Sequence, residues 1–127
     1  MILNFKRQFV PMILAGSKTH TIRGERKDGK SPLPGEILHM YTGLRQPGAE
    51  FLLRAPCSRT ETVQIDGAGD WLLMTIDGIR LTGDESELLA RRDGFENLAE
   101  MREFWRGRIP FRGWITHWDY KRAEFKR

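Results

Sequence analysis

The residues best suited to chemistry lie together near the start of the chain. Within six positions it carries Lys18, Thr19, Thr21 and Arg23. If this stretch forms a strand, Thr19, Thr21 and Arg23 point to the same side, because side chains alternate along a strand. A hydroxyl and a guanidinium would then meet in a cleft, and Lys18 would join them if the chain still turns there. The same residues also fit an ordinary surface strand with exposed charges and β-branched strand formers.

The patterns of the commonest catalytic and metal sites are absent. The chain has no G-x-S-x-G elbow, no phosphate-binding P-loop, no H-E-x-x-H motif and no paired C-x-x-C. The three histidines, His20, His39 and His117, and the single Cys57 lack the spacing of metal ligands. We therefore expect no metal and no cofactor, ordinary strand positions for the histidines, and a small buried side chain at Cys57.

Periodicity and capping residues predict the elements that must position the motif. A short helix over residues 7–15 tolerates Pro11 in its first turn and ends at a left-handed Gly16. Further helices are predicted over residues 85–92 and 98–105, with capping boxes of Asp84 with Glu87 and of Asn97 with Glu100. The predicted strands cover residues 19–23, 36–42, 51–65, 71–81 and 111–120, with breaks near 66–69 and 77–78. This order indicates an α+β fold dominated by a small antiparallel sheet or barrel.

Three motifs resemble those of a known family. The run over residues 13–23 resembles the signature of ASCH domains, in the PUA-like superfamily, and closely resembles that of the small bacterial N4-acetylcytidine amidohydrolases. Residues 34–38 are similar to the family's P/T-G-[DE]-x-L strand entry. Residues 90–95, followed by Phe104 and Trp105, are similar to its A-x-x-[DE]-G-F…F helix pair. The ordered similarity covers roughly residues 5–120.

This resemblance implies a PUA-like β-barrel of about five or six mainly antiparallel strands, with two or three short helices and a cleft beside the first helix. The scaffold is associated with the recognition of RNA and nucleosides. By motif position, Lys18 corresponds to the amidohydrolase general base and Thr21 to its nucleophile. Asp93 occupies the place of the acidic proton donor, which is a glutamate in the family's amidohydrolases and reaches one methylene further.

These roles make specific chemical demands on the residues. A threonine hydroxyl attacks an amide carbonyl only when a neighbouring base removes its proton. Lys18 must be neutral to do so, and burial together with the charge of Arg23 would lower the pKa of Lys18. Arg23 suits either a developing oxyanion or a phosphate. Burial near Phe95 is expected to raise the pKa of Asp93, although Asp93 and Gly94 also fit a simple helix end.

Composition limits the architecture and the place of action. The chain has 127 residues, which predicts a single domain over residues 1–127 with a basic, frayed tail at about 121–127. Its longest uncharged stretch, residues 9–17, is too short for a membrane span, and the N-terminus lacks a signal-peptide pattern. With only Cys57 available, no internal disulfide is possible. We expect a cytoplasmic protein with no membrane contact.

The distribution of charge fits either an anionic partner or an ordinary solvated surface of mixed charges. The net charge is +4, with seven basic and two acidic side chains in residues 1–30 and eight and three in residues 102–127. If the fold joins these ends, they form one positive surface suited to RNA. The predicted contacts, beyond Arg23 and Thr19, are Arg26, Lys27 and Arg45, with Tyr41 or Trp118 as stacking surfaces and Lys30, Arg106, Arg108, Arg112, Lys121 and Arg122 as further cations.

The sequence is therefore compatible with three functions. The first is hydrolysis of an acyl-amide such as that of N4-acetylcytidine, with Lys18, Thr21 and Asp93 as base, nucleophile and acid. The second is a non-catalytic RNA-binding module in which Lys18 and Arg23 contact phosphate. The third is a metal-independent ribonuclease that uses the same cleft with help from Tyr41 or His39.

Overall fold

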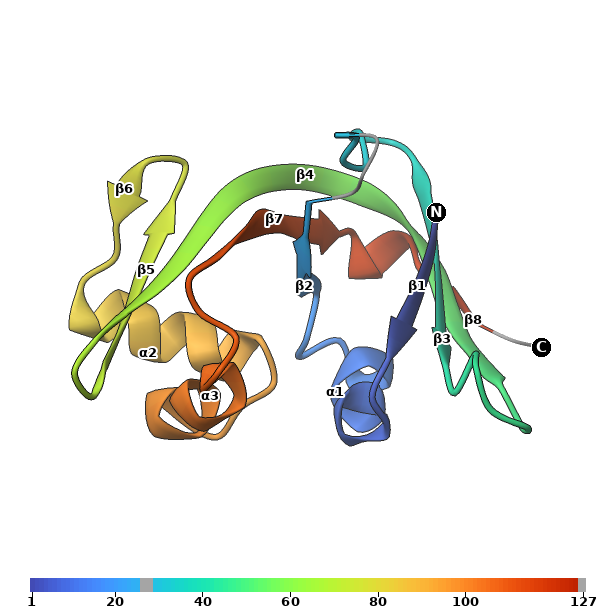
Figure 1. Ribbon diagram of the computed structural model, residues 1–127. Coiled ribbons are helices and arrows are strands. Elements are labelled where there is room, and N and C mark those ends of the chain that lie inside the picture. The colour runs from blue at the N-terminus through green and yellow to red at the C-terminus, as the bar shows by residue number, and fades with distance from the viewer. Residues whose placement is uncertain (26–28, 126–127) are drawn as a thin grey trace.

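The computed structural model describes residues 1–25 and 29–125 and has an α+β architecture (Figure 1). The helices in these residues are α1 (Val10–Ala15), α2 (Gly83–Arg92) and α3 (Leu98–Trp105), with the 3-10 turns η1 (Arg7–Phe9) and η2 (Tyr120–Arg122). The strands are β1 (Ile2–Phe5), β2 (His20–Gly24), β3 (Ile37–Thr42), β4 (Glu50–Ala68), β5 (Trp71–Ile76), β6 (Ile79–Arg80), β7 (Phe111–Trp118) and β8 (Glu124–Phe125). The α+β prediction is confirmed.

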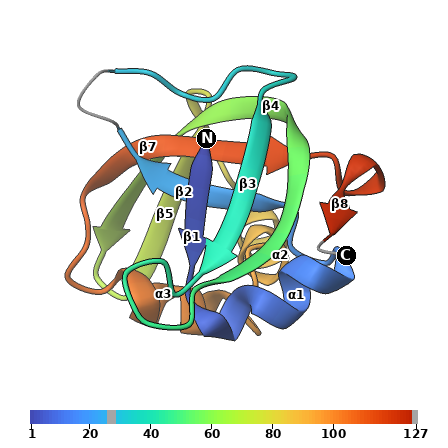
Figure 2. The same cartoon turned by 90° about the vertical axis from the view of Figure 1, so that its right-hand side faces the viewer.

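The sheet is organised around β4, which arches across the molecule (Figure 1, Figure 2). The first half of β4 pairs with β3 and β8, and β3 pairs in parallel with β1. The second half pairs with β5 and β7, which in turn pair with β6 and β2. The sheet has eight strands rather than five or six, and no pairing among the described residues joins its outer strands. It is therefore an open sheet in this part of the chain.

The change of partners along β4 has a local cause. Pro56 has no N–H to donate, and the register with β7 shifts between Cys57 and Arg59, as at a β-bulge. The strand bends where the ladder is interrupted, so its two halves can belong to different parts of the sheet. The break expected over residues 66–69 lies later, because β4 continues to Ala68 and turns into β5 at residues 69–70. The break expected near 77–78 is observed as the turn into β6.

α3 begins and ends as its sequence predicts, whereas α1 begins at Val10 rather than at residue 7 and α2 begins at Gly83 rather than at residue 85. α1 follows η1 and ends at Gly16, which has a left-handed φ of 81°. α3 has the predicted bounds, and the Asn97 side chain accepts the Glu100 N–H. In α2 the predicted capping box of Asp84 with Glu87 is wrong, because Thr82 and Glu85 form it two residues earlier.

Two short strands at the chain ends were not predicted. β1 alternates exposed Ile2 and Asn4 with buried Leu3 and Phe5, and its partner β3 is distant in sequence. At the other end, η2 and β8 are ordered and β8 pairs with β4, so the predicted fraying is wrong for residues 121–125. Residues 126–127 lie outside the described part of the chain.

The buried apolar side chains form one cluster beneath the arch of β4, from Leu3 to Trp118. Strands β1, β3, β4 and β7 contribute to it on one side, and α1, α2 and α3 contribute Ile13, Ala90 and Met101 on the other. Trp118 is only 3% exposed, so it cannot offer the stacking surface expected of it. No helix in the described residues is long and apolar enough to span a membrane.

Candidate functional site

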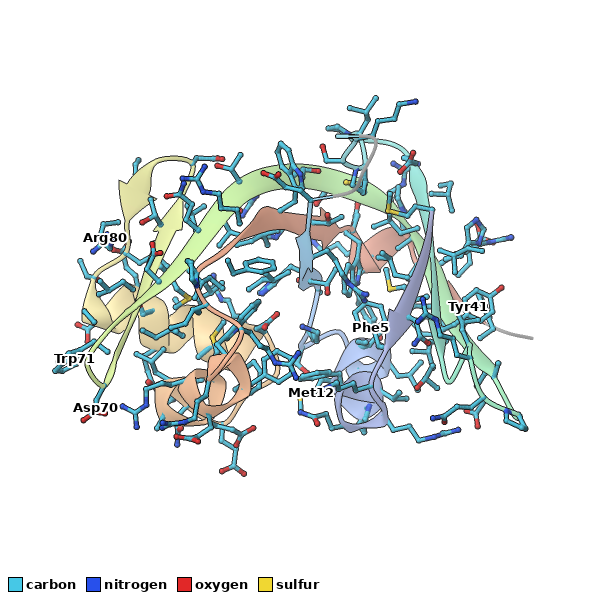
Figure 3. The ribbon with its side chains drawn as sticks, viewed as in Figure 1. Phe5, Met12, Tyr41, Asp70, Trp71 and Arg80 are labelled. Carbon is cyan, nitrogen blue, oxygen red and sulfur yellow. The ribbon has the colours of Figure 1, made fainter. Side chains whose placement is uncertain are left out.

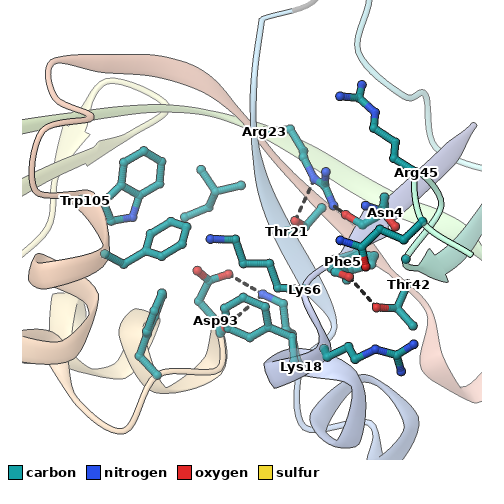
Figure 4. Close-up of a pocket in the computed structure, with 17 residues that line it drawn as sticks. Asn4, Phe5, Lys6, Lys18, Thr21, Arg23, Thr42, Arg45, Asp93 and Trp105 are labelled. Atoms are coloured by element: carbon teal, nitrogen blue, oxygen red, sulfur yellow. Dashed lines mark hydrogen bonds and ion pairs between the residues drawn. The ribbon is translucent and has the colours of Figure 1, made fainter. Parts of the chain in front are cut away.

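A pocket of about 620 Å³ opens between the α1–β1 region and the α2–α3 region (Figure 4). It lies within the range of volumes usual for small-molecule sites. Its aromatic and apolar lining comes from Phe5, Phe9, Ile22, Phe95, Phe104 and Trp105. Its polar lining comes from Asn4, Lys6, Arg7, Lys18, Thr21, Arg23, Thr42, Gly43, Arg45, Gln46 and Asp93. The predicted residues Lys18, Thr21, Arg23, Arg45 and Asp93 therefore share one pocket.

Lys18 reaches the pocket because α1 ends just before it. After Gly16, the N–H groups of Ser17 and Lys18 both donate to the Met12 carbonyl, which turns the chain towards β2. The Lys18 side chain is only 3% exposed. Its Nζ donates to Asp93 twice, to the backbone carbonyl at 2.6 Å and to Oδ1 at 2.7 Å. The Lys18 ammonium also lies 5.0 Å from the centre of the Phe9 ring.

Asp93 is held in place by the end of α2. It is the C-cap residue of the helix, and its N–H donates to the Leu89 carbonyl. Gly94 follows with a φ of 107°, and a Cβ at Gly94 would lie 2.7 Å from the Phe9 ring. The chain thus turns tightly against η1 and brings the Asp93 carboxylate to Lys18. Asp93 therefore both ends α2 and lines the pocket.

The pKa of Lys18 is shifted in the expected direction, but that of Asp93 is not. Burial lowers the pKa of Lys18, with a smaller contribution from Arg23, and the attraction of Asp93 offsets this only in part. Burial has the largest single effect on the pKa of Asp93 and raises it by favouring the neutral carboxyl group. Lys18 and His20 both lower this pKa, and together they outweigh the effect of burial. The pKa of Asp93 therefore lies below its ordinary value, and the expectation of a raised pKa is wrong. Asp93 is an ionised partner of Lys18.

Thr21 and Arg23 lie side by side on β2. Arg23 Nε donates to Thr21 Oγ1 at 3.1 Å, as their position on one face of the strand predicts. Arg23 is fixed further by a 2.6 Å bond to the Asn4 carbonyl and by the Phe5 ring, whose centre is 4.8 Å away. Burial lowers the pKa of Arg23. The hydrogen bonds of the described residues include none between Lys18 and Thr21, because Lys18 is turned towards Asp93 (Figure 4).

His20 is a site residue that sequence reasoning missed. It is 3% exposed, and its Nε2 lies 3.2 Å from Asp93 Oδ1 without the alignment of a hydrogen bond. Its ring packs against His117 at 5.4 Å between ring centres, and His117 Nε2 lies 2.6 Å from Glu61 Oε1. His20 precedes Thr21 in the motif, but no spacing signal distinguishes it from an ordinary strand histidine.

Lys6 and Arg7 were also missed. They line the pocket because β1 ends beside it, and β1 was not predicted. Lys6 Nζ lies 4.8 Å from the centre of the Phe104 ring, so its side chain reaches from the end of β1 to α3 (Figure 4). In the sequence, the only indication of this part of the pocket is the pair of adjacent cations, Lys6 and Arg7, at the start of the first predicted helix.

Other predicted contacts lie elsewhere. Thr19 precedes β2 and is absent from the pocket lining. Tyr41 packs its ring against Phe51, and Figure 3 shows it pointing away from the molecule on the side opposite Phe5. His39 lines a separate hollow with Arg54 and Arg122. The predictions for Arg26 and Lys27 fall outside the described residues.

The remaining chemistry-bearing side chains do not form a second centre. No group of three or more His, Cys, Asp or Glu side chains in the described residues is arranged to hold a metal ion. Cys57 is 2% exposed, as predicted, and burial raises the pKa of its thiol. A buried thiol with a raised pKa is a poor nucleophile.

Comparisons of the chain with protein-family models, with curated proteins and with solved structures found no match. A function must therefore be argued from the pocket and its chemistry.

Proposed function

We propose that this pocket binds a modified nucleoside and hydrolyses an acyl-amide on its base, with N4-acetylcytidine as the model substrate. The observation that carries the proposal is the buried Lys18–Asp93 pair in the same pocket as the hydrogen-bonded Thr21 and Arg23. A candidate base, a hydroxyl nucleophile and a cation thus share a site that also offers aromatic walls. This combination is what acyl transfer without a metal requires.

The aromatic end of the pocket suits a pyrimidine ring. Phe9, Phe95 and Phe104 lie near the Lys18–Asp93 pair, and Phe95 packs against both other rings at 5.7 and 5.4 Å between ring centres. Flat bases stack on such side chains with about 1–3 kcal/mol each. A base held there would carry its acylated amine towards the polar groups of the pocket.

Lys18 is the proposed general base. It accepts a proton only when neutral, and its lowered pKa increases the neutral fraction at a given pH. The Thr21 hydroxyl would then lose its proton to Lys18 Nζ as Oγ1 attacks the acyl carbon. Lys18 must turn from Asp93 towards Thr21 for this step, and catalytic hydrogen bonds commonly tighten only when substrate is bound.

Arg23 and Asp93 complete the proposed reaction. The Arg23 guanidinium, already 3.1 Å from Thr21 Oγ1, stabilises negative charge as it develops near that oxygen. When the C–N bond breaks, the proton held by Lys18 passes to the leaving nitrogen through Asp93, which starts ionised. Water then cleaves the acyl-threonine ester, which yields the free nucleoside and a carboxylic acid and restores Thr21.

We extend the proposal to the fold and the place of action. The order of a first helix, a set of strands, a helix pair and a late strand supports a PUA-like domain of the ASCH type whose sheet stays open in the described residues. Its partners would be modified nucleosides, free or within RNA. One buried cysteine is compatible with action in the reducing cytoplasm.

The test is a chromatographic assay for cytidine released from N4-acetylcytidine. The wild type should release cytidine, and Thr21→Ala should reduce the rate by at least about 100-fold because the nucleophile is lost. Thr75→Ala is the matched control. It removes a threonine hydroxyl from β5, outside the pocket, and should retain the wild-type rate. Equal rates for wild type and Thr21→Ala would contradict the proposal. Absence of release from all three proteins would favour a non-catalytic RNA- or nucleoside-binding domain.

A further inference from the structure

The pocket contains more positive charge than the proposed reaction uses. Lys6, Arg7 and Arg45 line it in addition to Lys18 and Arg23, and Asp93 is the single carboxylate that the described residues contribute to its lining. Asp93 is already engaged by Lys18. Arg7 lies 3.6 Å from Glu50, a long contact between two largely exposed side chains. In the described residues, no carboxylate pairs with Lys6 or Arg45.

Several arginines elsewhere on the surface are paired with carboxylates. Arg54 pairs with Glu124 at 2.6 Å, Arg106 with Glu103 at 2.6 Å and Arg91 with Glu87 at 3.2 Å. These paired arginines add no net positive charge to the surface outside the pocket. A long polyanion needs a charged track, whereas a small ligand needs only a local cluster.

The pocket also has two chemically different ends. Phe95, Phe104 and Trp105 come from α3 and the segment before it, next to Asp93. Arg45 lies on the opposite side with Asn4, Thr42 and Arg23, as Figure 4 shows. A ligand that fills both ends must combine a flat apolar ring with an anionic group.

We propose that the ligand is a nucleoside 5′-monophosphate, with its base at the aromatic end and its phosphate held by Arg45 and Arg7. The orientation of the base rests on the proposed function. Arginine suits this task because its planar fork can bond two phosphate oxygens at once. The dianionic phosphate also offsets the positive charge of these side chains, so it is favoured over an uncharged nucleoside.

The test compares the affinities of cytidine and cytidine 5′-monophosphate by titration calorimetry at low salt. The wild type should bind the monophosphate at least about tenfold more tightly, as charge-assisted hydrogen bonds to phosphate imply. Arg45→Gln should reduce this preference to about threefold or less. Arg80→Gln is the matched control, because Arg80 lies on β6 outside the pocket and bonds Thr75, and it should retain the preference.

Several outcomes would overturn the phosphate assignment. These are equal affinity for the two ligands, no binding of either, an equal loss in Arg80→Gln, or tighter binding of a short single-stranded RNA than of the monophosphate. The two proposals fail separately. Preferential binding of the monophosphate through Arg45 without any deacetylation contradicts only the proposed function. Equal kcat/KM for N4-acetylcytidine and its 5′-monophosphate contradicts only the phosphate site.

Discussion

Lys18 and Asp93 form a buried ion pair whose existence depends on both partners. Removing a charge from water is costly, and the attraction between the two groups offsets that cost only at close range. Here Lys18 Nζ reaches both the carboxylate and the carbonyl of Asp93 within 2.7 Å. A buried ion pair adds little to stability compared with apolar packing, so its presence at a pocket is better explained by chemistry than by folding.

This pair predicts a pH dependence of folding. The pKa of folded Asp93 is below its ordinary value of 3.8, so its contribution to stability is present above that pH. The contribution is lost as the pH falls through the lowered folded value, because the unfolded chain then binds the proton more readily. The free energy of unfolding, measured by urea titration, should therefore decrease in this acidic range.

Asp93→Asn isolates the effect. It leaves the Lys18 amine buried without a carboxylate, and we expect a loss of about 3 kcal/mol at neutral pH. The decrease in the free energy of unfolding on acidification should also become smaller. Asp70→Asn, at an exposed turn, serves as the control and should behave as the wild type. If Asp93→Asn changes neither the stability nor its pH dependence, the ion pair described here is wrong.

At this scale, sequence reasoning identified part of the site. Lys18, Thr21, Arg23, Arg45 and Asp93 do line one pocket, because the motif spacing and the helix end position them locally. The direction of the Asp93 pKa shift was not predictable, since it depends on Lys18 and His20, which are distant from it in sequence.

The junction between α2 and α3 is the element that brings Asp93 to the pocket. Gly94 has a φ of 107°, which L-residues rarely adopt, and a Cβ there would lie 2.7 Å from Phe9 and 3.1 Å from Met12 Sδ. Both the backbone and the packing against η1 and α1 therefore require glycine. The position of Asp93, one residue earlier, depends on this turn.

Gly94→Ala should therefore destabilise the fold by at least about 2 kcal/mol, through backbone strain and the clash with Phe9. Chemical denaturation followed by tryptophan fluorescence measures the change. Gly83→Ala is the matched control, since a Cβ there meets nothing within 4 Å and alanine favours the helix. Comparable effects of the two substitutions would show that the α2–α3 turn is not constrained as described.

Elements with local signals were predictable and elements with distant partners were not. The capping residue Asn97 and the glycine after α1 identified those helix ends. In contrast, β1 and β8 have four and two residues, and each depends on a partner far along the chain. The strand predicted over residues 51–65 is observed as β4, which extends to Ala68 because its last residues pair with β5.

The whole molecule joins two halves through the arch of β4, with the pocket beneath it (Figure 1). The half with β1, β3 and α1 supplies most of the cations, and the half with α2 and α3 supplies Asp93 and much of the aromatic lining. Of the cations in the N-terminal region, Lys6, Arg7, Lys18 and Arg23 line this pocket. The basic residues of the described C-terminal region do not line the pocket, so the two basic ends of the sequence do not form one binding surface within it.

The central claim is that this arrangement makes Lys18 a general base rather than a structural cation. Lys18→Arg tests it most directly, because arginine keeps the charge and can still donate to Asp93 but stays protonated at any accessible pH. The measurement is the rate of cytidine release from N4-acetylcytidine, with circular dichroism and nucleoside binding to confirm that the variant is folded. We predict a fall of at least about 100-fold in kcat for a folded variant. A folded Lys18→Arg protein with a rate within a few-fold of wild type would contradict the account.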